Sequence, residues 1–214
     1  MILSYSKNFI FIHLDKCGGT SIENALNPFL DKNDLKYGDL YYDKHDKINT
    51  GVLKKHSNSY EIKDYIKEKW HTMYKFTTVR NPKNLMISHY FYVKQNFKEN
   101  VPDPYFIFYS ESIKDKTGID GFIKKMINSK ISSTRPMMSR IDSSVEIFDI
   151  DNINIHWPNI LKKIKINEEV KLEKLNQSIK PNNIILKEET INLIYKNFKI
   201  DYETIPKITG HEWK

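Results

Sequence analysis

Two short hydrophobic runs stand out from a polar chain, and a segment with helical spacing follows each of them. The first run spans residues 9–14 and leads through a glycine-containing turn into a helix predicted to begin at Thr20 or Ser21. The second run spans residues 76–79, and the spacing of apolar residues after it predicts a helix over about 83–98. The chain therefore contains two predicted units of strand, turn and helix.

The remaining pattern adds elements of both kinds. Apolar residues at helical spacing predict further helices, and one more β-rich run predicts a strand. These elements are helices over 59–70 (with Ser59 as the capping residue), 119–129, 157–164 and 188–198, and a strand over 145–150. The irregular segments are expected at 31–59, which is polar, at 100–115, which contains two prolines, and at 132–140.

The alternation of strands and helices predicts an α/β fold. We expect a three-layer, P-loop-like arrangement in which helices flank a central, mainly parallel sheet. The chain has 214 residues and shows neither an internal repeat nor a clear linker. Residues 1–214 are therefore predicted to form a single domain.

The amino-acid composition limits the kinds of molecule that the chain is expected to bind. Lys and Arg number 34 against 27 Asp and Glu, and the formal net charge of +7 favours anionic partners. No nucleic-acid recognition motif or continuous basic stripe supports a nucleic-acid partner. The single cysteine, Cys17, excludes an intramolecular disulfide. No apolar run has the length of a membrane span and no signal peptide is recognisable, so a cytoplasmic protein is expected.

The turn after the first strand has the residues of an anion site. Lys16 comes first, and Gly18 and Gly19 then lead into Thr20 and Ser21. The main-chain N–H groups of such a turn and of the helix start attract an anion. The order is the reverse of a Walker nucleotide loop, in which the lysine follows the glycines, and no dinucleotide fingerprint is present. An ordinary ATPase or dehydrogenase is therefore disfavoured, and a purely structural turn is the alternative.

A second candidate phosphate site follows the second strand. Arg80 stands at the end of that strand, and Ser88 lies about two helical turns into the next element. A guanidinium fork and a hydroxyl at these positions can share one phosphate. Lys16 and Arg80 both follow strands, which is where the ligands of open α/β sheets bind. The alternative is a structural ion pair for Arg80 and a helix-face position for Ser88.

Together the two segments resemble the carbohydrate sulfotransferases of the heparan and chondroitin type. The family's 5′-phosphosulfate loop has the pattern h-x-H-x-P-K-T-G-G-T-S, and residues 11–21 are Phe-Ile-His-Leu-Asp-Lys-Cys-Gly-Gly-Thr-Ser. Its 3′-phosphate motif has the pattern V-R-N-P-x-x-R-x-x-S-x-Y, which residues 79–90 match except at Leu85. Asp15 and Cys17 are the other departures, since they replace a common proline and a common threonine or serine.

The resemblance implies a sulfotransferase that takes 3′-phosphoadenosine 5′-phosphosulfate (PAPS) as its donor substrate and needs no metal. Lys16 would steady the leaving phosphate as its bond to sulfur breaks. Cys17 lacks the hydroxyl of the family residue, and no cysteine nucleophile is required. The resemblance assigns the 5′-phosphosulfate to Lys16, Cys17, Gly18, Gly19, Thr20 and Ser21, and the 3′-phosphate to Arg80 and Ser88.

The sulfate acceptor must lose a proton, and the resembled family often has a catalytic histidine in the interval that contains His56. We therefore predict His56 as the base, because an imidazole suits proton transfer near neutral pH. The alternative is a surface or helix-start position for this histidine. The weaker candidates are His13, His45, His89, Glu23 and Glu61.

The acceptor is predicted only by class, as a hydroxyl group on a carbohydrate. Arg135 and Arg140 are candidates for gripping an anionic acceptor or the donor, and Ser178 and Lys180 for covering the nucleotide. Eukaryotic relatives usually carry a Golgi anchor, so its absence implies a bacterial or viral source. Two other functions stay open: a nucleotide-dependent phosphotransferase, and a non-catalytic nucleotide- or glycan-binding module.

Overall fold

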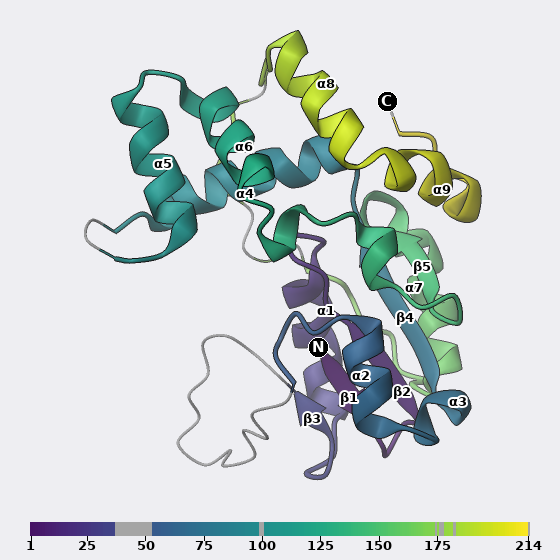
Figure 1. Cartoon of the computed structure of the whole chain (residues 1–214). Coiled ribbons are helices and arrows are strands. Elements are labelled where there is room, and N and C mark those ends of the chain that lie inside the picture. Colours follow the sequence, from purple (N-terminus) through teal and green to yellow (C-terminus); the bar gives the residue numbers. More distant parts are fainter. Residues whose placement is uncertain (37–52, 99–100, 174, 176–177, 182, 214) are drawn as a thin grey trace. The chain divides into compact units, whose positions relative to one another are not determined.

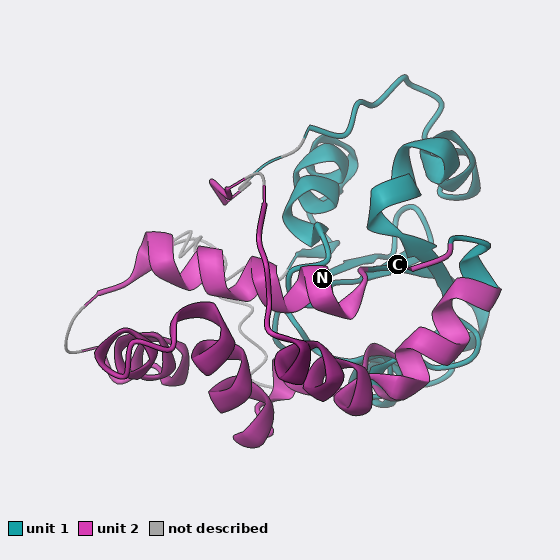
Figure 2. Cartoon of the chain, turned by 90° about the horizontal axis from the view of Figure 1, so that it is seen from above, with its two compact units in different colours: residues 1–79, 140–175, 208–211 teal, residues 80–139, 176–207, 212–214 magenta. Residues whose placement is uncertain are grey.

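The computed structural model describes residues 1–36, 53–98, 101–173, 175, 178–181 and 183–213 (Figure 1). The chain divides into two compact units. Unit 1 comprises residues 1–79, 140–175 and 208–211, and unit 2 comprises residues 80–139, 176–207 and 212–214 (Figure 2). Unit 1 holds the sheet, whereas the described part of unit 2 is helical. That residues 1–214 form one domain stays a prediction.

Unit 1 is built on a five-stranded sheet in the order β3–β1–β2–β4–β5. The strands are β1 (Ile2–Ser4), β2 (Phe9–Ile12), β3 (Leu35–Lys36), β4 (Tyr74–Val79) and β5 (Glu146–Asp149). β2, β4 and β5 pair in parallel, whereas β1 pairs antiparallel with both β2 and β3. The α/β prediction is confirmed, but the prediction of a mainly parallel sheet is wrong, because a turn at residues 5–8 folds β1 back onto β2 as a hairpin.

Helices flank this sheet. α1 (Gly19–Leu26) and α7 (Ile153–Lys163) join the strands in one buried core cluster. Phe9 and Phe11 both belong to it, because alternate side chains of a strand point to the same face. Lys75 immediately precedes the clustered Phe76 in β4 and points to the other face, where its Nζ donates to the carbonyl of Trp70 in α3 (Lys69–Thr72). The remaining helix of this part is α2 (Ser59–Ile66).

The start of α2 differs from the prediction. Asn58, and not Ser59, is the N-cap, and it forms a reciprocal capping box with the third residue of the helix. Ser59 Oγ instead donates to the main-chain carbonyl of Arg140 at 3.0 Å. The helix predicted over 59–70 breaks at Lys67, whose φ is +51°, and continues as α3.

The described part of unit 2 consists of helices and 3₁₀ turns. α4 (Pro82–Asn96) begins at Asn81 and Pro82 as predicted, since the Asn81 side chain accepts from the N–H of Lys83. A helix also occupies part of the segment predicted to be irregular, because Pro104 stands in its first turn, where proline is tolerated. The remaining elements that lie wholly or mostly in unit 2 are α5 (Pro104–Lys114), α6 (Gly118–Asn128), α8 (Glu188–Asn197) and α9 (Lys199–Thr209), with 3₁₀ turns at Ser132–Thr134 and Met137–Arg140.

Among the described residues, none of the helices is long and apolar enough to cross a membrane.

Candidate functional site

The predicted anion loop follows β2 directly. Lys16 adopts a left-handed conformation with φ +57°, and Gly18 has φ +78° and is the N-cap of α1. No side chain of the described residues caps this helix start. Main-chain N–H groups at the start of a helix attract negative charge, so an uncapped start suits an anionic group of a ligand.

Gly18 and Gly19 are each required in the loop, for different structural reasons. A Cβ added to Gly19 would overlap the ring of His13, which packs against this position. A Cβ added to Gly18 would meet the side chain of Ile150, and the positive φ of Gly18 strains any other residue. The loop backbone therefore depends on glycine at both positions.

Hydrogen bonds tie the loop to the rest of unit 1. Thr78 of β4 donates through Oγ1 to the carbonyl of Cys17 at 2.7 Å. The Cys17 side chain is buried, and its Sγ donates to the carbonyl of Asp15 at 3.3 Å. Ser21 Oγ accepts from the N–H of Leu175 at 3.1 Å. Cys17 thus supports the loop from inside, and Ser21 anchors the segment that ends at Leu175.

His13 and Glu23 form a buried polar pair beside the loop. His13 Nδ1 lies 2.8 Å from Glu23 Oε1, and the amino group of Met1 lies 2.6 Å from the same oxygen. Burial lowers the pKa of His13 to about 4, despite the hydrogen bond to Glu23. Burial alone would raise the pKa of Glu23, but the hydrogen bond from His13 and the charge of Met1 lower it to about 2. A neutral His13 therefore donates through Nδ1 to an ionised Glu23.

The structure places His56 next to the anion loop. Its Nδ1 lies 3.0 Å from the carbonyl oxygen of His13, and its Nε2 lies 3.4 Å from Asp15 Oδ1. The rings of His13 and His56 meet edge to face with centroids 4.7 Å apart. The side chain of His56 is 30% exposed. The predicted base and the predicted anion loop are therefore neighbours within unit 1.

Sequence reasoning did not link Asp15 with Arg140. Arg140 Nη1 lies 3.1 Å from Asp15 Oδ2, and Arg140 Nη2 donates to the carbonyl of His56 at 3.1 Å. The side chain of Arg140 is only 10% exposed. The signal in the sequence was the carboxylate at position 15, where the resembled family commonly has proline. A charged residue there needs a partner, and Arg140 supplies it.

Arg80 and Ser88 belong to unit 2. Arg80 is the first residue after β4 and is half-buried, and Ser88 is a buried residue of α4. Arg135 is exposed, whereas Ser178 and Lys180 are half-buried.

The structure does not describe all of the predicted candidate residues. His45 and most of the segment predicted to be irregular before His56 lie outside the described residues. In the part of the chain that is described, no cluster of three or more His, Cys, Asp or Glu could hold a metal ion.

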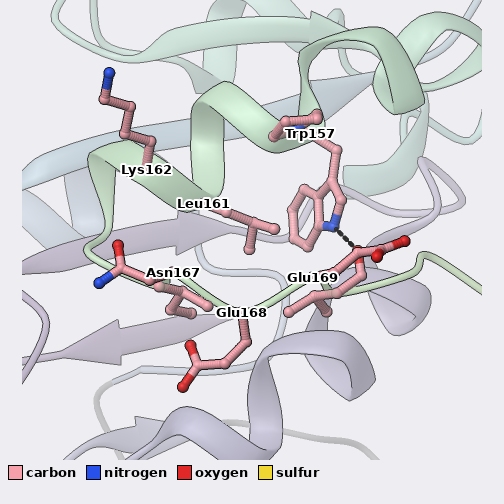
Figure 3. A pocket seen from close by; sticks show the side chains of 9 residues that line it. Trp157, Leu161, Lys162, Asn167, Glu168 and Glu169 are labelled. Carbon is pink, nitrogen blue, oxygen red and sulfur yellow. Dashed lines mark hydrogen bonds between the residues drawn. The ribbon is translucent and has the colours of Figure 1, made fainter.

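Two pockets occur in unit 1. One, of about 360 Å³, lies between α7 and residues 166–170, where Trp157 Nε1 donates to the carbonyl of Val170 at 2.8 Å (Figure 3). No predicted site residue lines it. The other, of about 610 Å³, is lined by α1 residues that include Ser21, and by residues 169–171. Neither pocket contains Lys16 or His56, so we define the candidate site by the loop and its polar contacts.

A comparison of the chain with models of protein families finds no match, and comparisons with curated proteins and with solved structures find none. The resemblance to sulfotransferases therefore depends on the two motifs alone.

Proposed function

We propose that the protein is a sulfotransferase that moves a sulfuryl group from PAPS to a hydroxyl group of a carbohydrate. The observation that carries the proposal is the uncapped start of α1, with Lys16 before it and His56 beside it. A P-loop-like arrangement of the sheet belongs to the proposal, and the parallel pairing of β2, β4 and β5 supports it. The cytoplasmic location and the bacterial or viral source stay predictions.

The loop residues would bind the 5′-phosphosulfate. An anionic phosphosulfate needs hydrogen-bond donors, and the N–H groups at the start of α1 and the hydroxyl of Thr20 would supply them. Lys16 would neutralise the bridging oxygen as its bond to sulfur breaks, which is electrostatic stabilisation of the leaving group. The motif resemblance assigns the 3′-phosphate to Arg80 and Ser88.

His56 would take the proton of the acceptor. The carbonyl oxygen of His13 can only accept a hydrogen bond, so Nδ1 of His56 carries a proton. Nε2 is then the ring nitrogen that can receive the hydroxyl proton. Because carbohydrates present many hydroxyl groups, this chemistry suits the predicted acceptor class.

Calorimetry with 3′-phosphoadenosine 5′-phosphate (PAP), the product of the donor, tests the proposal. We expect Lys16→Ala and Arg80→Ala each to weaken PAP binding by about 10-fold or more, since each removes a charge-assisted contact. Lys32→Ala, which removes an exposed lysine of unit 1, serves as the control and should leave binding unchanged. A folded wild-type protein that does not bind PAP would contradict the proposal.

The same samples separate the other two functions. Tighter binding of ATP with magnesium than of PAP would favour a phosphotransferase. PAP binding without transfer from PAPS to water or to any member of a broad panel of carbohydrates would favour a non-catalytic binding module.

A further inference from the structure

His56 is held by two different acceptors on its two ring nitrogens. Nδ1 faces the carbonyl oxygen of His13 at 3.0 Å, and Nε2 faces the carboxylate of Asp15 at 3.4 Å. Neither of these oxygens can donate a hydrogen bond while Asp15 is ionised. Each ring nitrogen of His56 therefore faces an oxygen that accepts hydrogen bonds.

The proton that His56 gains in the proposed reaction changes its contact with Asp15. With the proton on Nδ1, the lone pair of Nε2 would point toward the negative charge of Asp15, which is unfavourable. After Nε2 gains a proton, the same contact becomes an attraction between opposite charges. The 3.4 Å separation exceeds the roughly 2.7–2.9 Å of a fully formed charge-assisted hydrogen bond. The contact is thus placed to stabilise the charge that His56 gains in the reaction.

Arg140 fixes Asp15 for this task. Its guanidinium group contacts the second carboxylate oxygen of Asp15 and the main-chain carbonyl of His56. One side chain therefore spans both partners and sets the distance between them. The planar fork of arginine suits such a double contact, whereas lysine would lose its geometry.

We propose that Asp15 is a positioning residue, which, clamped by Arg140, orients His56 and balances the charge that His56 gains when it takes the acceptor's proton. The inference rests on the proposed function. The acceptor hydroxyl gives its proton to Nε2, and the acceptor oxygen forms a bond to sulfur. The bond between sulfur and the bridging oxygen breaks, and its electron pair leaves with PAP. Asp15 acts through His56 and exchanges no proton itself.

A double-variant cycle tests this role. Asp15→Asn is expected to lower kcat about 10-fold, because a contact between opposite charges is lost in the transition state. PAP affinity should stay within about 2-fold of wild type. In a His56→Ala background, Asp15→Asn should change kcat by less than about 2-fold, since its route to the reaction is already absent. Asp64→Asn, an exposed aspartate of α2, is the matched control.

Arg140→Lys provides a second variant in case Asp15→Asn does not fold, as judged by thermal unfolding. It keeps the positive charge but loses the double contact, so a smaller loss of kcat is expected, again only when His56 is present. Turnover is followed as release of PAP from PAPS, with water or a carbohydrate from the panel as acceptor.

Long-range proton–nitrogen NMR spectra of the His56 ring need no substrate. His56 is assigned by the loss of its signals in His56→Ala. We expect a proton on Nδ1 of the wild-type ring, and a change in the Nε2 shift in Asp15→Asn but none in Asp64→Asn. An unchanged Nε2 shift, or losses of kcat that add independently in the cycle, would overturn the inference. A protein that binds no PAP refutes the proposed function instead, and the NMR result still decides whether Asp15 positions His56.

Discussion

Glu23 in unit 1 and Asp201 in unit 2 are both buried carboxylates, but their surroundings are opposite. Glu23 in unit 1 is contacted by the amino group of Met1 and by His13 Nδ1. Asp201 in unit 2 accepts from two neutral main-chain N–H groups, those of Met137 and Met138, at 2.8 and 2.9 Å. The pKa of Glu23 is lowered to about 2, whereas burial raises the pKa of Asp201 to about 6 despite its two hydrogen bonds.

The difference shows what a buried carboxylate needs in order to stay ionised. Two main-chain hydrogen bonds do not offset the loss of hydration at Asp201, but a neighbouring positive charge together with the hydrogen bond from His13 does so at Glu23. The ionised carboxylate belongs to the unit with the anion loop, where it fixes His13 against Gly19. The four changes below test this contrast.

Removing the charge of Glu23 should have the largest effect. Glu23→Gln removes the carboxylate that the buried amino group of Met1 contacts at 2.6 Å, and we expect the free energy of unfolding to fall by about 4 kcal/mol. Urea unfolding at pH 7 measures it. Glu168→Gln, an exposed glutamate of unit 1, should change stability by less than about 0.5 kcal/mol. A loss below about 1 kcal/mol in Glu23→Gln would show that the pair is not needed.

The packing of His13 on the loop is tested by Gly19→Ala. The added methyl group would overlap a ring that Glu23 holds in place, so we expect a loss of about 3 kcal/mol and weaker PAP binding. Gly118→Ala is the contrast in unit 2. No atom lies within 4 Å of the added Cβ there, and only the positive φ is costly, by about 1 kcal/mol. Equal losses in the two variants would refute a steric role of His13.

Acid should destabilise the protein through His13. The pKa of His13 is lowered from its ordinary value of 6.5 to about 4 in the folded protein, so the unfolded chain binds a proton first as the pH falls. The contribution of His13 to the free energy of unfolding is therefore lost between pH 6.5 and 4. The free energy of unfolding falls there by at most about 1.4 kcal/mol per pH unit. Urea unfolding across this window should show a smaller slope for His13→Gln. An identical slope would mean that His13 is charged in the folded protein.

Asp201→Asn should have the smallest effect at neutral pH and the opposite pH dependence. Burial raises the pKa of Asp201 from its ordinary value of 3.8 to about 6 in the folded protein, so this site adds stability as the pH falls through that window. At pH 7 the Asp201→Asn side chain keeps only one of the two acceptor oxygens, so we expect the free energy of unfolding to fall by about 1 kcal/mol. Its deficit relative to wild type should grow toward pH 4, as measured by urea unfolding. A deficit that shrinks toward pH 4 would contradict the raised pKa.

The sequence predicted those elements whose signals are local. The hydrophobic run at 9–14 and the glycine turn gave β2 and the start of α1, and Asn81 with Pro82 gave the start of α4. Two failures have local causes as well. β1 has only three residues, too few for a pattern, and Pro104 was interpreted as a breaker although it opens a helix.

Only some contacts of the candidate site could be anticipated from the sequence. The loop stands out because its residues are contiguous, and the family resemblance pointed to His56, which lies beside His13 in the structure. The contacts of Asp15 with His56 and Arg140 could not be predicted, because no short-range pattern records which distant residue will meet a given carboxylate. The predicted roles of Lys16, Arg80, Ser88 and His56 remain predictions.

The contact between Arg140 and Asp15 also predicts the order in which parts of the candidate site form during folding. Arg140 lies 125 residues from Asp15 along the chain, whereas Glu23 lies only 10 residues from His13. Closing a longer stretch of chain costs more entropy, and contacts of high sequence separation form slowly. During refolding the anion loop should therefore form before Arg140 contacts Asp15. A refolding sample is expected to recover affinity for PAP first and turnover later.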